Sequence, residues 1–159
     1  MSDALVTRPA TMRDAEELAP RLRVGDRAAL CAAVPGVDLA RLLGAAVEAS
    51  DVPHAFVRGG GGVEGLAGLT PLDDREALIW VAGSDSLLHP LREFASACRA
   101  ILDEHLRDRE RLLSRVHHGD ASIERWHVWL GFRPVSQSDP VHDLLLSRPT
   151  AALMEMRRW

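Results

Sequence analysis

An unbroken apolar run, Ala77–Ala82, stands directly before the strongest helical pattern in the chain. A run of this length and composition is typical of a strand that is covered on both faces of a sheet. Pro90 suits the first turn of the helix that follows. Its apolar face is predicted from residues at helical spacing: Leu91, Phe94, Cys98, Ile101 and His105. This part of the chain therefore predicts a buried strand followed by a helix that packs on the sheet.

The other segments are also predicted to be strands or helices. Further strands are predicted over 4–9, 55–58, 63–69, 111–116 and 151–156, with Gly59–Gly62 as a hairpin turn. A first helix is predicted after a Thr11–Asp14 capping box, with others over 26–34, 38–49 and 121–130. This order predicts an α/β fold, a mixed sheet with helices packed on it, as one domain over 1–159.

Composition narrows the class of protein. A chain of 159 residues, 47% hydrophobic with mean hydropathy −0.06, has the balance of a soluble domain. No apolar run approaches the roughly 18–20 residues of a membrane span. The first residues show no signal peptide, so we expect the cytoplasm as location. Net charge −4 argues against a nucleic-acid partner. Cys31 and Cys98 are predicted to be buried thiols.

Three segments carry a resemblance to the GNAT acyltransferases. Val116–Phe132 resembles their strand–Asn–helix–"Leu-Gly-Phe" signature, Val6–Ala15 their opening, and Leu153–Arg157 their last strand. The resemblance implies a GNAT-like mixed, mostly antiparallel sheet and acetyl-CoA or CoA as the cofactor. The chain is also similar to a phage-encoded subgroup that includes internal virion proteins, through Leu22–Arg27, Ile79–Asp85 and His89–Leu91. That similarity implies phage or virion proteins as partners, in the host cytoplasm or the virion.

The resemblance places the pyrophosphate loop after the apolar strand. GNAT enzymes hold the pyrophosphate on backbone N–H groups in a glycine-rich loop at a helix N-terminus. Here Val81–Pro90 offers one glycine, no arginine and an acid at Asp85. Two interpretations stay open: a reduced anion-binding nest, or a turn in which Ser86 or His89 caps the helix. The candidate cofactor-binding residues are Val81, Gly83, Ser84 and Asp120, the last at the family's Asn position.

The resemblance also implies positions for the catalytic groups. Many GNAT enzymes protonate the leaving thiolate with a Tyr, and this chain contains no Tyr. His127 occupies that position, and a histidine can donate a proton near neutral pH. Its alternative role is a partly buried polar residue between Trp126 and Trp129. Glu64 is the candidate general base, with Glu76 second, and the alternative for both is a solvated residue at a strand end.

Other patterns predict structure and not chemistry. The glycine turn lacks the Lys of a P-loop, and His117 and His118 point to opposite faces of a strand, which disfavours a metal site. Solvated basic residues are expected at Arg107, Arg109, Arg111 and Arg115, and core positions at Trp80, Trp126 and Trp129. Two functions follow: a GNAT-type N-acyltransferase with a degenerate loop and weak or absent catalysis, or a non-enzymatic virion protein.

Overall fold

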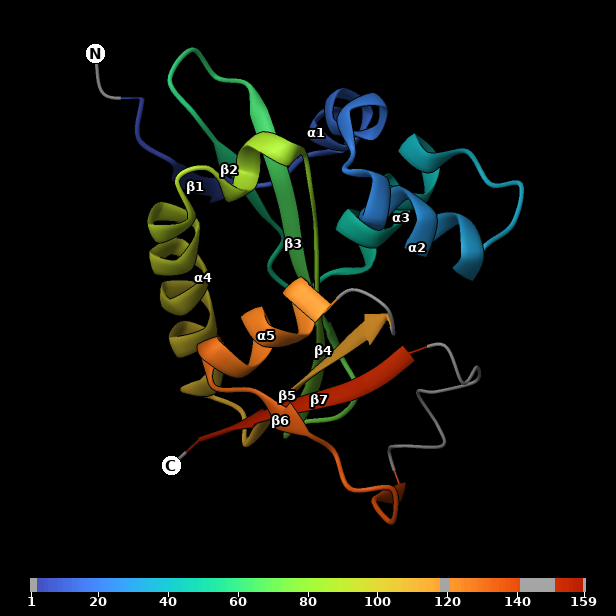
Figure 1. Cartoon of the computed structure of the whole chain (residues 1–159), viewed down its shortest axis with the longest axis vertical. Coiled ribbons are helices and arrows are strands. Elements are labelled where there is room, and N and C mark those ends of the chain that lie inside the picture. Colours follow the sequence, from blue (N-terminus) through green and yellow to red (C-terminus); the bar gives the residue numbers. More distant parts are fainter. Residues whose placement is uncertain (1–2, 118–120, 141–150, 159) are drawn as a thin grey trace.

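The structure is a computed structural model that describes residues 3–117, 121–140 and 151–158. Within them a seven-stranded sheet runs in the order β1-β2-β3-β4-β5-β7-β6 (Figure 1). The strands are β1 Val6–Pro9, β2 His54–Val57, β3 Val63–Pro71, β4 Glu76–Gly83, β5 Arg111–His117, β6 Arg133–Pro134 and β7 Ala151–Arg157. Among these described pairs β4–β5 is parallel and the others are antiparallel. The prediction of a mixed, mostly antiparallel sheet flanked by helices is confirmed.

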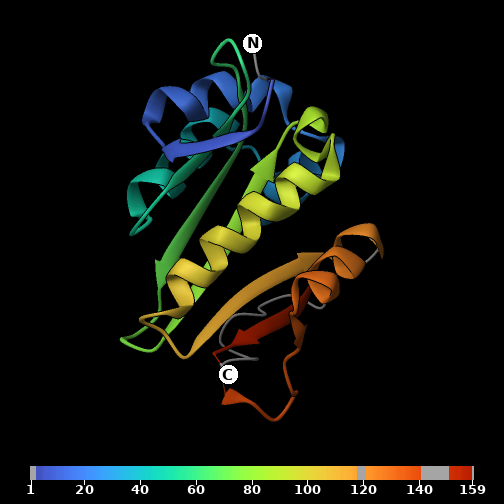
Figure 2. The same ribbon diagram turned by 90° about the vertical axis from the view of Figure 1, so that its left-hand side faces the viewer.

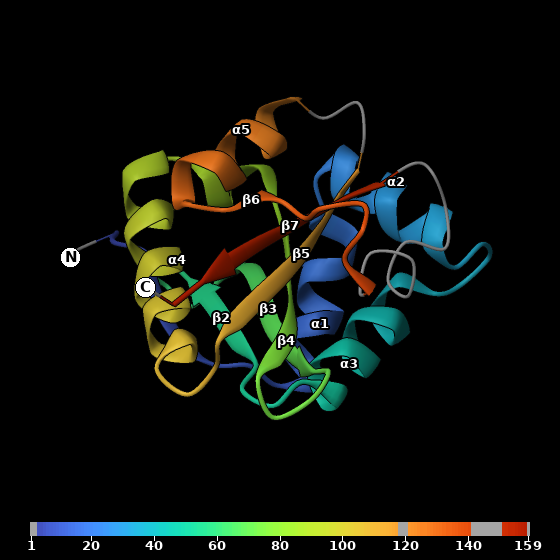
Figure 3. The same cartoon turned by 90° about the horizontal axis from the view of Figure 1, so that it is seen from below.

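Helices cover both faces of the sheet. They are α1 Met12–Leu18, α2 Val24–Ala33, α3 Leu39–Ala49, α4 Leu91–Leu106 and α5 Ala121–Leu130, with short 3-10 helices η1 Ala19–Arg21 and η2 Asp85–Leu88. Figure 3 shows α4 and α5 on one side of the sheet and α1–α3 on the other. Each side has its own apolar core. Phe56, Phe94 and Leu112 belong to the α4/α5 core, and Leu18, Leu43 and Leu66 belong to the α1/α3 core.

The capping box predicted at the first helix is present and extends to the first strand. The Asp14 carboxylate accepts hydrogen bonds from the Thr11 N–H at 2.7 Å and from both terminal nitrogens of Arg8 at 2.7 and 2.8 Å. Buried Asp14 is thereby paired, and the hydrogen bond from Arg8 is the main reason that its pKa lies below the ordinary value. The box thus starts α1 and also ties it to β1.

Several predictions of burial were wrong. Cys31 is exposed, because α2 turns this part of its surface to solvent, whereas Cys98 is buried as predicted. Trp129 is 63% exposed, since it stacks on the outer side of Trp126 and not inside the core. Periodicity located the helices, but it could not show which of their faces would be covered.

The sheet splits between its two central strands. The β4–β5 ladder covers only Glu76–Leu78 opposite Arg111–Leu113. Beyond it β4 stays with β3, β5 stays with β7, and the two strands diverge (Figure 2). The closed end of the split is held by Arg111, whose side chain pairs with Glu76, Asp139 and Glu155. The prediction that Arg111 is solvated was wrong: the residue starts a strand, and carboxylates of neighbouring segments surround it.

Candidate functional site

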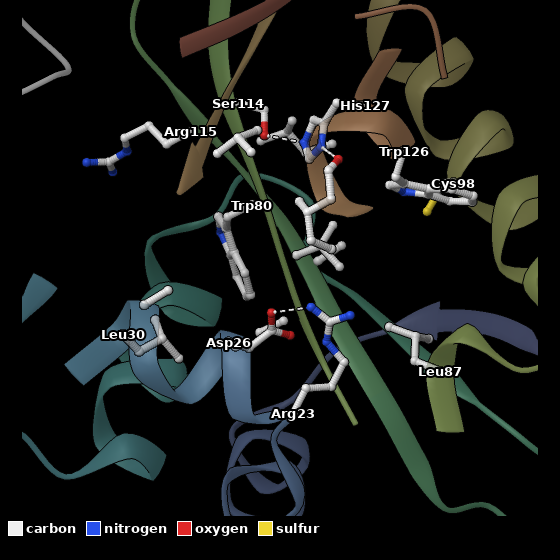
Figure 4. A pocket seen from close by; sticks show the side chains of 18 of the residues that line it. Arg23, Asp26, Leu30, Trp80, Leu87, Cys98, Ser114, Arg115, Trp126 and His127 are labelled. Atoms are coloured by element: carbon white, nitrogen blue, oxygen red, sulfur yellow. Dashed lines mark hydrogen bonds and ion pairs between the residues drawn. The ribbon is translucent and has the colours of Figure 1, made fainter. Parts of the chain in front are cut away.

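A cavity of about 1030 Å³ opens where β4 and β5 diverge. Residues of α2, α3 and β4 line one part of it and residues of β5, α4 and α5 another, mostly with apolar side chains. Among the polar exceptions Figure 4 shows a Ser114–His127 pair from β5 and α5, and Asp26 of α2 paired with Arg23, the N-cap of that helix. The split thus produces a mainly apolar chamber with a few polar groups, which is typical of a small-molecule site.

The exposed edge of β4 supplies main-chain polar groups to this split. The Ser84 N–H donates to the Glu64 carbonyl across β3, whereas the main-chain groups of Gly83 bond to α2 on the other side. In an antiparallel pair successive residues alternate in this way. Because the β3–β4 register is continuous from Gly83 to Ala77, the N–H and C=O of Val81 face the split. Val81, a candidate cofactor-binding residue, also lines the cavity.

The loop after β4 has few free N–H groups. Residues Asp85–Leu88 form η2, in which the Leu87 N–H donates to the Ser84 carbonyl and the His89 N–H to the Ser86 carbonyl. Pro90, which was expected in the first turn, is instead the N-cap of α4, and no side chain of Ser86 or His89 caps this helix. The interpretation in which Ser86 or His89 caps the helix is therefore wrong, whereas the reduced anion-binding nest stays a prediction.

Gly83 is held by α2 and packed against η2. Its N–H donates to the Asp26 carboxylate at 2.8 Å, and its carbonyl accepts from the Arg23 N–H at 2.9 Å. Arg23 also pairs with Asp26 through its guanidinium at 3.1 Å. A Cβ at position 83 would lie 2.3 Å from a Leu87 methyl group, so any side chain here would force Leu87 to shift. The Gly83 N–H thus already donates to a carboxylate of the protein itself.

Glu64 is not a solvated residue, and the alternative stated for it was wrong. The residue is buried and accepts a 2.5 Å hydrogen bond from the Ser84 hydroxyl and a 3.0 Å bond from Arg21. Neither Glu64 nor Ser84 is among the residues that line the cavity. Their strand positions point them toward η1, so their hydrogen bonds join β3, β4 and η1. Glu76 likewise lies at the closed end of the split, bound to Arg111 at 2.8 Å.

His127 lies in the cavity wall, at the position where the sequence placed a catalytic group. Its Nε2 is 2.8 Å from the Ser114 hydroxyl, and its Nδ1 is 2.8 Å from the Ile123 carbonyl one turn earlier in α5. Burial lowers the pKa of the imidazole, against the hydrogen bond to Ile123. Burial thus favours the neutral ring, and both of its nitrogens have hydrogen-bond partners. Asp120, also predicted for the site, lies outside the described residues.

Sequence reasoning missed two polar residues of this chamber, Ser114 and Asp26. Ser114 belongs to a predicted strand and Asp26 to a predicted helix, and nothing in the local pattern distinguishes them from surface residues. Their partners, His127 and Gly83, come from distant parts of the chain. Either residue could have been identified only from knowledge that β5 contacts α5 and that β4 contacts α2.

Two broader classes of site were also searched within the described residues. In 3–117, 121–140 and 151–158 no group of His, Cys, Asp and Glu side chains is arranged to hold a metal ion. No helix in that part of the chain has both the length and the apolar character needed to cross a membrane.

The arrangement of elements is shared with known proteins. The chain is similar to Ard1 from Thermoplasma volcanium, with TM-score 0.70 and 13% identity over 98% of this chain and 99% of that one. It is similar to the ribosomal-protein-S18-alanine N-acetyltransferase from Escherichia coli, with TM-score 0.66 and 14% identity over 96% and 93%. A GNAT-family acetyltransferase from Staphylococcus aureus gives TM-score 0.70 and 12% identity over 97% and 99%. At these identities the likeness establishes the GNAT fold.

No protein-family model and no curated protein matches the sequence. The chain therefore shares its fold with these solved structures although no family or curated protein matches its sequence. Function has to be argued from the site.

Proposed function

We propose that this protein is a GNAT-type acyltransferase that takes an acyl group from a thioester, acetyl-CoA or a related donor, and transfers it to an amine. The observation that carries this proposal is the split between β4 and β5, which opens into the cavity of about 1030 Å³. The solved structures that share the fold support the same reaction class, since two of those described above are acetyltransferases by name.

The chamber fits one part of a CoA thioester better than the other. The arm of CoA carries amide groups, and the Val81 N–H and C=O at the open edge of β4 offer them strand-like hydrogen bonds. The apolar lining suits the methylene groups and the acyl chain. The loop offers the pyrophosphate fewer free N–H donors, because Gly83, Ser84, Leu87 and His89 donate their N–H groups to other atoms of the protein. We infer a donor bound chiefly through its arm, with a degenerate pyrophosphate loop and slow transfer.

Ligand-induced stabilisation tests this proposal directly. We expect acetyl-CoA and acetyl-pantetheine, which lacks the nucleotide, to raise the melting temperature to a similar extent, and ADP to leave it unchanged. A ligand at about 100 times its Kd stabilises the fold by roughly 2.7 kcal/mol. If ADP stabilises the protein and acetyl-pantetheine does not, the arm is not the binding determinant. If millimolar concentrations of both thioesters have no effect, the acyltransferase proposal fails.

A matched pair of variants on one helix links binding to the chamber. Ala29 of α2 lines the cavity, whereas Ala33 of the same helix is exposed and lies outside it. We expect Ala29→Trp to weaken thioester binding at least tenfold by filling the chamber, and Ala33→Trp to leave it unchanged. Equal binding by both variants would place the thioester elsewhere.

The finer resemblance, to phage-encoded GNAT-like proteins, remains a prediction from sequence. None of the three solved structures described above is named as a phage or virion protein. No contact among the described residues favours a virion role over acyl transfer, so we propose the enzyme alone.

A further inference from the structure

The Ser114–His127 pair has the geometry of a nucleophile and its base. The serine hydroxyl lies 2.8 Å from His127 Nε2, and both residues line the chamber. A third group orients the ring, since His127 Nδ1 is 2.8 Å from the Ile123 carbonyl. Nucleophile, base and orienting acceptor form the arrangement that activates serine in covalent catalysis.

The hydrogen bonds fix the direction in which a proton can move. A carbonyl oxygen only accepts, so the Nδ1 atom of His127 carries the proton that is shared with Ile123. In a neutral imidazole the other nitrogen, Nε2, then has a free lone pair, and it accepts the Ser114 hydroxyl proton. Burial favours this neutral form by lowering the pKa of the ring. His127 is therefore arranged to act first as a base, and the proton that it accepts from Ser114 is then available to a leaving group.

The surroundings suit an attack on a thioester carbonyl. Ser114 lies on β5 beyond the last residue that pairs with β4, so it is located at the split. The main-chain groups of Val81, which are proposed to hold the arm of the donor, face the same split from the opposite strand. The Ser114 side chain lies on the α4/α5 side of the sheet, because its strand neighbours Leu112 and Val116 pack in the core on that side. Water is largely excluded there, which strengthens these interactions.

We propose that Ser114 is acylated by the thioester, with His127 as its general base, so that the acyl group passes through an ester on the protein before it reaches the amine. This inference rests on the proposed function for the identity of the donor. Ser114 Oγ attacks the carbonyl carbon, its proton moves to His127 Nε2, and the C–S bond breaks. The leaving thiolate takes the proton from Nε2 and departs as a thiol. In the second half an amine attacks the ester, His127 accepts a proton from it, and Ser114 Oγ receives that proton as the C–O bond breaks.

Quenched-flow mass spectrometry of the intact chain detects the intermediate. The protein is mixed with acetyl-CoA without an amine, or with p-nitrophenyl acetate as a CoA-independent donor, and the acylated peptide is identified. We expect one acetyl group on the peptide that contains Ser114, and none on Ser114→Ala. The matched control is Ser96→Ala, at an exposed position of α4, which should be acetylated like the wild type. His127→Phe should slow acylation by about 10²–10⁴-fold, the usual contribution of general base catalysis.

Conservative replacement separates chemistry from folding. Ser114→Cys keeps a nucleophile in place and should form a thioester adduct with the same donors, whereas circular dichroism should show every variant folded. A hydrogen bond that only positions His127 would give no adduct in the wild type or in Ser114→Cys.

The outcomes distinguish this inference from the proposed function. If acetyl-CoA stabilises the fold but neither donor acylates Ser114 at any quench time, the covalent route is wrong and direct transfer remains. If p-nitrophenyl acetate acylates Ser114 while no thioester binds, the nucleophile stands and the proposed donor is wrong. Acylation that His127→Phe leaves unchanged would overturn the role of the histidine as base.

Discussion

Arg111 offers the sharpest test of how the closed end of the split is held together. Its side chain is 6% exposed and contacts Glu76, Asp139 and Glu155 at 2.5, 2.6 and 2.9 Å, joining β4, β5 and β7 at the closed end. Burial opposes the charge of Arg111, but hydrogen bonds to Asp139 and Glu155 outweigh it and raise its pKa. Replacing it with the similarly shaped Met leaves these carboxylates without their shared cation.

The expected loss of folding stability follows from how exposed the three carboxylates are. Removing one partner of a buried ion pair costs about 3–5 kcal/mol, because the other charge stays buried. Glu76 and Asp139 are 25% and 20% exposed, so water screens them in part. Glu155 is 11% exposed and retains a 3.2 Å contact with half-exposed Arg157. We therefore expect Arg111→Met to cost about 3 kcal/mol, at the lower end of this range. For a domain of this size that corresponds to a fall in Tm of roughly 6–12 °C.

Urea unfolding at several pH values provides the assay. Burial raises the pKa of Glu155, but hydrogen bonds from Arg111 and Arg157 outweigh it, so the pKa is lowered in the folded state. A carboxyl with a lowered pKa stabilises the fold above its unfolded pKa and loses that effect as the pH falls. The gap between wild type and Arg111→Met should therefore be widest near pH 7 and narrow below about pH 4.

The control is the exposed Arg75–Glu110 pair at 3.7 Å, where Arg75→Met should change stability by less than about 1 kcal/mol. Adding Glu155→Gln to Arg111→Met should recover part of the loss, because it removes a buried charge whose remaining described partner, Arg157, is half-exposed. A loss below about 1 kcal/mol for Arg111→Met, or a gap that does not vary with pH, would refute the reasoning from unpaired carboxylates.

Three further variants or measurements test packing and titration. Gly68→Ala should destabilise the fold by about 1–3 kcal/mol in urea unfolding, since its Cβ would lie 2.5 Å from Trp80 Nε1, and a neutral result would contradict this close packing. Burial lowers the pKa of His54, so the unfolded state binds the proton first and stability should fall as the pH drops below about 6.5; His54→Phe should flatten that profile. An alkylating reagent should label exposed Cys31 in the native protein and spare Cys98, whose thiol pKa burial raises to about 12, and peptide mapping would show the reverse if the burial were wrong.

The order of strands and helices was predictable because each element has a local signature. The apolar run of β4 and the helical spacing of α4 located both within a few residues, and the capping box fixed the start of α1. The short elements η2 and β6 were not predicted. Such short segments contain too few residues for a period to be visible. β6 forms by pairing with β7, and η2 is a single turn whose hydrogen bonds are local.

The candidate site was predictable only where a motif fixed a residue's place relative to the fold. His127 is the twelfth residue of the Val116–Phe132 motif and lies in the cavity wall, but its chemical role depends on which atom Ser114 offers it. The opening beside that contact begins where β5 leaves β4, after Leu113, which is the last residue of β5 that pairs with β4. The closed end of the split is held by Arg111, whose carboxylate partners are spread from position 76 to position 155. No local pattern encodes this ion cluster or the Ser114–His127 contact, because the partners in each come from different elements of the fold.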